Sequence, residues 1–379
     1  MAPRTIAAPL AAAHLNVTDS PGRTERIVNA DYEFQHDRLD AEYVLPLKWE
    51  TYCAGDVFEL TDYLIDLAEC LDVTVVDGST EPVFAAHHAL WGGLVRHVAP
   101  DGPSTRNGKV ASVLTGIRLS RHEKVILADD DVRYDRRGLE RMVEELHYAD
   151  VVRPQNYFTA LPWHARWDTA RSLLNRAVAS DYPGTLGVNR DLVLALGGYD
   201  GNVLFENLEL IRTVRAGGGR ERRVDDLFVG RIPPKTEQFA GQRVRQAYDS
   251  FAQPARLTLE LALLPLLGAS ILHPVRLIGF ATAVLALAEV GRQRSGGTRV
   301  FPVTSALWAP VWVLERAVCV WLAVGERMRG GVKYGSSRLR RAAHSKAALQ
   351  ERLERRGPGH ASDATALRRA RRYAVGLWP

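Results

Sequence analysis

Three short apolar runs, separated by helix-like stretches, constrain the fold of this chain most strongly. The runs are Tyr43–Leu47, Val73–Val76 and Lys124–Ala128, and each is followed by polar residues. Their length is typical of buried strands. Between the first two runs, Val57–Cys70 carries apolar residues at helical spacing. This alternation predicts an α/β domain over residues 41–255, with a mainly parallel sheet flanked by helices.

The composition is that of an ordinary globular protein. The chain has 379 residues, of which 46% are hydrophobic and 25% charged. These values exclude a wholly disordered or collagen-like protein. Three scattered cysteines, Cys53, Cys70 and Cys319, argue against a disulfide framework or a cysteine-based zinc site. Residues 1–40 show no sustained period, and we expect a poorly ordered leader there rather than a signal peptide.

Residues 256–326 form an apolar region that we expect to associate with a membrane. Within it, Leu257–Val290 and Val303–Val324 are interrupted by prolines and charges such as Pro265 and Glu315. Neither segment resembles an unbroken span of about 20 uncharged residues. A helical hairpin, re-entrant helices or amphipathic helices in the interface fit better than a single crossing. The alternative is a helical subdomain packed against the core.

Residues 327–379 form a basic tail. From Glu326 to Pro379 the sequence has 14 Lys and Arg against 4 Asp and Glu, whereas the rest of the chain has an acidic excess. Such a tail is typical of a segment that binds an anionic partner, or of a solvated and partly disordered segment. Few aromatic residues lie among its arginines, so we expect anionic lipid rather than nucleic acid. With the basic loop between the apolar segments, this predicts a cell-membrane protein whose α/β domain is cytoplasmic.

Three consecutive carboxylates, Asp129, Asp130 and Asp131, directly follow a predicted strand. Adjacent carboxylates repel one another, and a divalent cation makes the arrangement favourable. Mg²⁺ and Mn²⁺ prefer oxygen ligands, so the triplet predicts a metal site.

Two further polar positions follow the same logic. Asp77 ends the run before the triplet, and it either contacts a nucleotide or belongs to an Asp-Gly turn. Lys109 either meets a phosphate as a point charge or is simply solvated. A P-loop is excluded here because Val110 stands where a Ser or Thr is required.

In their order along the chain, these motifs resemble those of the family 2 glycosyltransferases, which have the GT-A fold. The resemblance runs from about Tyr43 to Gln253. The first matching motifs are an opening strand at Val44–Glu50, a nucleotide-contacting Asp at Asp77–Ser79 and a Gly-Lys pair at Asn107–Lys109. They are followed by a DxD motif at Asp129–Asp131, an acceptor-side strand at Gly184–Arg190 and a Gly-Gly-aromatic-Asp turn at Gly197–Asp200.

The resemblance implies roles for individual residues. Asp129 and Asp131 would hold the metal, and Asp131 would be catalytic. The donor would be bound by residues near the strand ends: Pro46, Glu50, Asp77, Lys109, Asp129 and Asp130. The acceptor and the diphosphate would be contacted by residues later in the chain: Gly184, Asn207, Gln242, Arg243 and Arg245.

Two departures from the family pattern affect the expected chemistry. The Glu-Asp pair of the family, whose Asp acts as base, is Glu206-Asn207 here. An amide cannot accept a proton in that role, so Glu206 becomes the expected base, with Glu209 as a second candidate. The QxxRW motif appears with Gln246 in place of Trp, which argues against processive polymer synthesis.

The implied activity is inverting transfer of a sugar from a nucleotide-sugar donor to a hydroxyl acceptor, with Mg²⁺ or Mn²⁺. The apolar region makes a lipid-linked acceptor at the cytosolic membrane face attractive. One alternative is a phosphatase of the DxDx(T/V) type, with Asp129 as nucleophile, Asp131 as acid and Asp225-Asp226 as its further acidic pair. Another is a catalytically inactive, membrane-associated protein that binds nucleotide-sugars.

Overall fold

The computed structural model describes residues 38–102, 105–179, 181–335 and 337–355. From Leu39 on, these residues belong to one compact unit. The predicted leader, apart from its last three residues, and the tail from residue 356 lie outside the described part of the chain.

The described residues include an eight-stranded sheet whose order is β3-β2-β1-β4-β7-β6-β8-β5. One half is parallel and contains β1 (Glu42–Leu47), β2 (Asp72–Asp77), β3 (Arg96–Val98) and β4 (Lys124–Ala128). Antiparallel pairing begins where β4 meets β7. The second half contains β5 (Val132–Arg133), β6 (Val151–Phe158), β7 (Thr185–Asn189) and β8 (Glu221–Arg231). The three predicted strands are confirmed, and the sheet as a whole is mixed.

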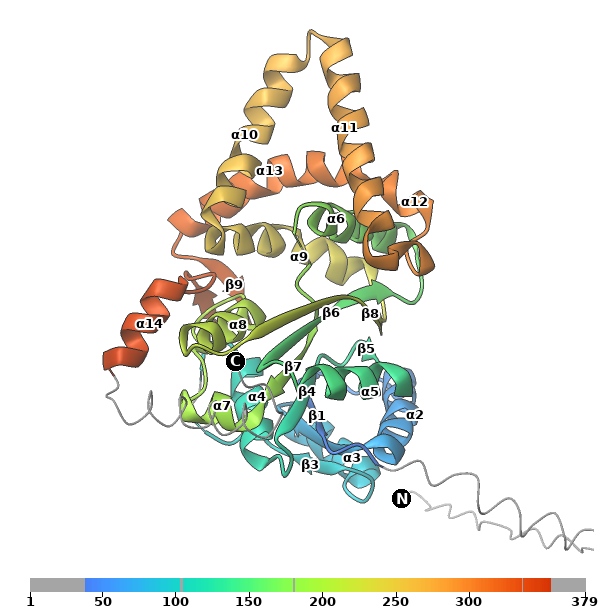
Figure 1. Ribbon diagram of the computed structural model, residues 1–379, viewed down its shortest axis with the longest axis vertical. Helices are drawn as coiled ribbons and strands as arrows, with labels where there is room; N and C mark the ends of the chain where they lie inside the picture. The colour runs from blue at the N-terminus through green and yellow to red at the C-terminus, as the bar shows by residue number, and fades with distance from the viewer. Residues whose placement is uncertain (1–37, 103–104, 180, 336, 356–379) are drawn as a thin grey trace, which may run out of the picture. The chain divides into compact units, whose positions relative to one another are not determined.

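Helices cover both faces of the sheet (Figure 1). One face packs against α2 (Ala54–Cys70), α3 (Glu81–Trp91) and α5 (Arg136–Glu145). The other packs against α4 (Gly108–Leu119), α7 (Arg190–Ala195) and α8 (Glu206–Ala216).

The close packing of α4 on β1 depends on a glycine. A Cβ at Gly116 would lie 2.2 Å from a methyl carbon of Val44, so a side chain there would push the helix away from the sheet. Lys109 is in the first turn of the same helix. The close contact at Gly116 therefore sets the position of Lys109 relative to the strand ends.

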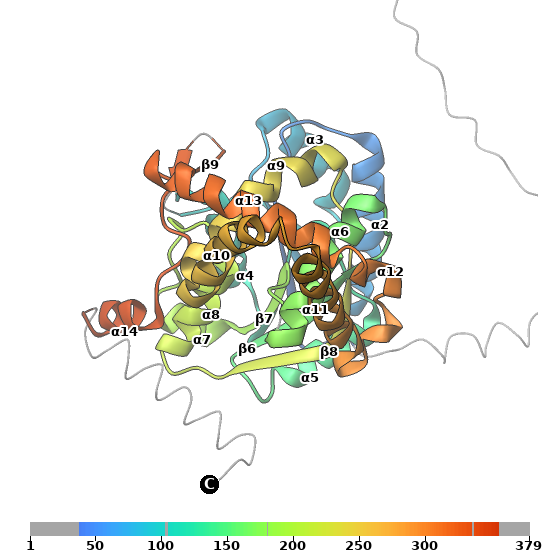
Figure 2. The ribbon, with the colours of Figure 1, turned by 90° about the horizontal axis from the view of Figure 1, so that it is seen from above.

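The apolar region folds into helices that lie over α6 (Trp163–Val178) and α9 (Thr236–Tyr248), as Figure 2 shows. After η1 (Asp249–Ala252), α10 (Pro254–Ser270) and α11 (Pro274–Gln293) form a hairpin, and α13 passes across its base (Figure 1). The chain between them contains η2 (Arg294–Arg299) and α12 (Val303–Ala306), and α13 spans Ala309–Met328. At the hairpin tip, Ile271, Leu272 and Val275 are 70%, 85% and 81% exposed.

Two helical stretches of the described chain are long and apolar enough to cross a membrane. They are Pro274–Arg299 and Val303–Met328. In the most apolar 18-residue window of each, 17% of the first and 44% of the second is buried. A core helix of a soluble protein passes the same test of length and composition. The second stretch behaves in part as such a helix, because α13 buries Trp312, Val313 and Val320.

The first part of the predicted basic tail is packed structure. It forms a hairpin of β9 (Val332–Tyr334) and β10 (Ser337–Leu339), followed by α14 (Lys346–Arg355). His344 lies 2.7 Å from the carboxylate of Glu209, and Arg352 lies 2.8 Å from that of Asp200. Several of the tail's charges are thus used within the unit.

Candidate active site

The carboxyl ends of β1, β2 and β4 are tied together by Trp49. Its backbone N–H donates to Ser79 Oγ at 2.7 Å, and its indole Nε1–H donates to Asp130 Oδ2 at 2.7 Å. These strands are parallel neighbours, so their ends meet at one edge of the sheet. Sequence reasoning assigned Trp49 no role of its own, although an aromatic residue two positions after a strand end was the available signal.

Lys109 joins the acidic triplet to the start of α8. Its Nζ lies 2.5 Å from Asp129 Oδ1 and 2.7 Å from Glu206 Oε1. Burial lowers the pKa of Lys109, but the two carboxylates outweigh burial and hold that pKa well above its ordinary value. For the acid Glu206, burial has the opposite effect and raises the pKa. The charge and hydrogen bond of Lys109 outweigh burial, so the pKa of Glu206 lies below its ordinary value. Lys109 and Glu206 are therefore both charged at neutral pH.

The two outer carboxylates of the triplet converge on Arg231, the last residue of β8. Arg231 Nε lies 2.7 Å from Asp131 Oδ2, and its Nη2 lies 4.0 Å from Asp129 Oδ2. Asp131 Oδ1 is buried and has no hydrogen-bond partner among the described residues. An unpartnered buried oxygen beside a second carboxylate fits a divalent cation, which prefers oxygen ligands. Arg231 belongs to no recognised motif, so sequence reasoning missed it.

Asp77 is enclosed by polar neighbours at the end of β2. The residue is 1% exposed, and its Oδ2 lies 2.7 Å from His87 Nδ1 and 3.2 Å from His97 Nε2. Its Oδ1 accepts the N–H of Ser79 at 2.8 Å. Burial raises the pKa of Asp77, but the hydrogen bonds from His97, Ser79 and His87 lower it to about 2. Asp77 and the two histidines are close enough to share a metal ion, and hydrogen bonds account for the close contacts of Asp77 with each of them.

A pocket of about 170 Å³ adjoins the triplet and is lined by several residues that the sequence predicts to contact an acceptor, so we call it the acceptor-side pocket. Gly184 lines it beside Asp129, and a Cβ at Gly184 would lie 3.0 Å from Asp129 Oδ2. Asn207 also lines it, and its Nδ2 donates to the carbonyl of Pro183 at 2.9 Å. The amide therefore holds the turn before β7. The pocket brings together five of the predicted site residues: Asp129, Gly184, Glu206, Asn207 and Arg245.

The β9–β10 hairpin contacts a residue of this pocket, Arg245, through Tyr334. The guanidinium carbon of Arg245 lies 4.5 Å from the centre of the Tyr334 ring. The Tyr334 hydroxyl donates to Asn107 Oδ1 at 3.0 Å, two residues before Lys109. Arg245 is thus oriented by a segment that the sequence assigned to a tail.

Other predicted site residues lie elsewhere. Pro46 is half-buried within β1, and Glu50 is exposed just beyond Trp49. Gln242 is half-buried on α9 and does not line the pocket, whereas Gln246, one turn later, does.

Two charged residues serve packing. Arg243 is buried and lies 3.3 Å from Asp168 and 3.5 Å from Glu315, so it joins α9 to α6 and α13. Glu209 is fully buried, and its two oxygens accept from the backbone N–H of His344 and contact its Nδ1, each at 2.7 Å. Neither residue lines the acceptor-side pocket.

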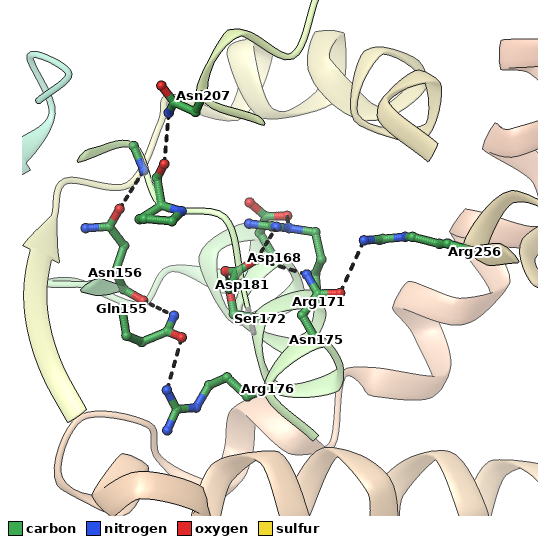
Figure 3. Close-up of polar contacts among 12 residues, drawn as sticks. Gln155, Asn156, Asp168, Arg171, Ser172, Asn175, Arg176, Asp181, Asn207 and Arg256 are labelled. Atoms are coloured by element: carbon green, nitrogen blue, oxygen red, sulfur yellow. Dashed lines mark hydrogen bonds and ion pairs between the residues drawn. The ribbon is translucent and has the colours of Figure 1, made fainter. Parts of the chain in front are cut away.

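Residues of α6 and α10 also line the pocket, and Figure 3 shows the polar contacts among them. Asp181 accepts from Arg171 Nη1 at 2.8 Å and from Asn175 Nδ2 at 2.9 Å. Arg256, on α10, donates to Asn175 Oδ1 at 3.3 Å. Sequence reasoning missed this network because its members come from a helix without a motif and from the apolar region.

Comparisons with known proteins give structural matches only. No family model matches the chain, and no curated protein matches it. A mannosyltransferase from Pyrobaculum calidifontis, solved with GDP-Man and Mn²⁺, is 18% identical, with 76% of this chain and 88% of that chain covered and a TM-score of 0.47. Glucosyl-3-phosphoglycerate synthase from Mycobacterium tuberculosis, solved with Mn²⁺, UDP-glucose and phosphoglyceric acid, is 18% identical, with 53% and 74% covered and a TM-score of 0.37.

Proposed function

We propose that this protein is an inverting glycosyltransferase that moves a sugar from a nucleotide-sugar to a hydroxyl acceptor. The observation that carries the proposal is the contact of Lys109 with both Asp129 and Glu206. Breaking a sugar–diphosphate bond leaves negative charge on the departing group, and the acceptor must lose a proton. The site supplies cations for the first requirement and an ionised carboxylate for the second.

The residues divide these tasks by position. Asp129 and Asp131 would hold Mg²⁺ or Mn²⁺, which when bound supplies positive charge beside the donor diphosphate. Lys109 and Arg231 donate hydrogen bonds to diphosphate oxygens, with Arg245 available from the acceptor side. Glu206 accepts the proton of the acceptor hydroxyl, whose oxygen bonds to the anomeric carbon as the bond to the diphosphate breaks. Attack from the opposite face inverts the anomeric configuration.

Membrane association through residues 257–324 belongs to the same proposal, with the catalytic domain on the cytoplasmic side and a lipid-linked acceptor. Its support is the apolar tip of the α10–α11 hairpin, where Ile271, Leu272 and Val275 are exposed together. Exposed apolar residues gathered at one end of a helical hairpin favour insertion into a bilayer interface.

The test is turnover of a panel of nucleotide-sugars by the purified full-length protein with Mn²⁺ or Mg²⁺. We expect release of a nucleoside diphosphate from one donor, and we expect Glu206→Gln to keep donor binding but lose transfer. Absence of both binding and turnover with folded protein would contradict the proposal. Binding without turnover, unchanged by Glu206→Gln, would instead support an inactive nucleotide-sugar-binding protein.

The phosphatase alternative needs a further acidic pair near Asp129. Asp226 instead pairs with Arg141 at 2.9 Å. It lies five positions before Arg231, the β8 residue that reaches Asp129, which is roughly 16 Å along a strand. The geometry therefore favours glycosyl transfer over phosphoryl transfer.

A further inference from the structure

Arg316 is a buried cation that has no hydrogen-bond partner among the described residues. It lies on α13, is 0% exposed and lines the acceptor-side pocket. None of its three guanidinium nitrogens has a hydrogen-bond partner in the described part of the chain. Its guanidinium carbon lies 4.9 Å from the centre of the Trp312 ring. A buried, unpaired guanidinium is costly, so its position at a pocket points to an anionic ligand.

Three of the described acids lie near Arg316: Asp249 lines the same pocket without a hydrogen bond to Arg316, and Glu260 and Glu315 have other partners. Glu260 accepts from Ser250 Oγ at 2.7 Å and from Arg256 Nε at 2.8 Å. Glu315 accepts from Trp167 Nε1 at 3.2 Å and lies 3.5 Å from Arg243. Neither carboxylate hydrogen-bonds to Arg316.

Arg256 and Arg171 line the same pocket, and both lie near enough to Arg316 to interact with its charge. Arg171 is held by Asp181, and Arg256 extends from α10 toward Asn175, as Figure 3 shows. Gln246 also lines the pocket, and its buried Oε1 has no partner among the described residues. Three guanidinium groups in a small pocket are suited to a phosphate, which accepts several charge-assisted hydrogen bonds.

A second, larger cavity of about 940 Å³ adjoins this pocket. Four residues line both cavities: Asn175, Tyr182, Gln253 and Arg256. Much of the larger cavity's wall is apolar and comes from the hairpin and α13, including Leu259, Leu263, Phe280, Val284, Leu287 and Val313. A polar pocket that leads into an apolar cavity matches a ligand with a charged head and a hydrocarbon chain.

We propose that the acceptor is a lipid that carries a phosphate group. The phosphate lies on Arg316 and Arg256, and the hydrocarbon chain occupies the apolar cavity between α10, α11 and α13. This inference rests on the proposed glycosyl transfer and names its acceptor class. The hairpin, whose tip is apolar, then places the cavity beside the membrane that supplies the lipid.

The test measures binding to full-length protein without nucleotide-sugar or divalent cation. The probes are decyl phosphate, inorganic phosphate and the neutral amphiphile decyl maltoside, titrated below their micelle concentrations. Wild-type protein should bind decyl phosphate at least tenfold more tightly than either other probe. Equal binding of the two amphiphiles would overturn the phosphate assignment, and equal binding of the two phosphates would overturn the lipid assignment.

Variants separate the two parts of the ligand. Arg316→Met should remove the preference for decyl phosphate over decyl maltoside, while Leu263→Trp should weaken decyl phosphate and spare inorganic phosphate. Arg166→Met changes a half-buried arginine on α6 that hydrogen-bonds to Thr304; it is the control and should bind like wild type. Decyl phosphate binding unchanged by Arg316→Met would overturn the proposal.

Stability distinguishes ligand recognition from a structural role. Arg316→Met should melt at the same or a higher temperature than wild type, because it replaces an unpaired buried charge with an apolar side chain. A large loss of stability with ligand preference retained would overturn the assignment. If Arg316→Met does not fold, Arg316→Lys and Leu263→Trp carry the test, and Arg316→Lys should lose at least part of the phosphate preference. Donor turnover is measured separately, so failure of these binding tests would overturn the lipid-phosphate acceptor without contradicting the proposed glycosyl transfer.

Discussion

The ammonium of Lys109 lies 2.7 Å from a carboxylate oxygen of Glu206, and the same ammonium lies 2.5 Å from Asp129. One cation is therefore shared between Asp129 and Glu206, the acids that we propose act on the donor and on the acceptor. A diphosphate oxygen that contacts Lys109 competes with Glu206 for it. Such competition would make Glu206 more basic when the donor is in place.

We expect Lys109→Gln to shift the pH dependence of transfer. Lys109 is the main reason that the pKa of Glu206 lies below its ordinary value despite burial. Without that ammonium, the pKa of Glu206 rises, and the acidic limb of kcat/KM moves to higher pH. Donor affinity should also fall, by about tenfold for the loss of a charge-assisted contact. The measurement is a pH–rate profile with the donor found in the panel, and an unmoved acidic limb would contradict the assignment of Glu206 as base.

Trp49→Phe should loosen the junction of three strands. The substitution keeps an aromatic ring but removes the Nε1–H that donates to Asp130. Loss of one partly buried hydrogen bond to a carboxylate should reduce the free energy of unfolding by about 1 kcal/mol. Urea denaturation measures this loss. Trp163→Phe makes the same change at a half-exposed position on α6. It is the matched control and should change stability much less.

The parallel half of the fold could be predicted from sequence because each strand is a short apolar run with polar residues after it. Lys124–Ala128 is β4 as predicted, and α2 ends at Cys70 as predicted. The second half, in which β6 and β8 pair in parallel and the other pairs are antiparallel, could not be predicted in the same way. Pairing of β7 with both β4 and β6 depends on contacts between distant segments, which local periodicity does not report.

The same distinction, between local motifs and contacts of distant segments, applies to the site residues. Asp129 and Lys109 lie in motifs at element ends, so their type and position indicated a role. Arg231, Arg256 and Arg316 reach the site from a strand end and two helices whose sequences carry no motif. Only the packing of α10 and α13 on α6 brings the last two to the pocket.

Asp249→Asn should flatten the pH dependence of stability. Burial raises the pKa of the Asp249 carboxyl from 3.8 to about 7, against the opposing effect of Arg245. Between these two pH values the folded protein holds a proton that the unfolded chain has lost, so the free energy of unfolding falls as pH rises and levels off above about 7. Asparagine stays neutral throughout this range. The variant should therefore be more stable than wild type at pH 8 and close to it at pH 4.

Urea denaturation at several values between pH 4 and pH 8 checks this expectation. Asp191→Asn, which changes a half-exposed acid paired with Arg190, is the control and should follow the wild-type curve. An Asp249→Asn curve parallel to that of wild type would show that Asp249 ionises normally in the folded protein.

Charged substitutions at the hairpin tip should weaken membrane binding. Leu272 and Ile271 are 85% and 70% exposed at the turn between α10 and α11, where apolar side chains gain free energy only by leaving water. Replacing either with Lys should leave the folded unit intact, because neither side chain packs in its core. It should reduce binding to neutral phosphatidylcholine vesicles several-fold, measured by co-sedimentation. Phe58→Lys makes the same change at a 62% exposed position on α2 and should bind vesicles like wild type, so equal loss from both sites would rule out the tip as the membrane contact.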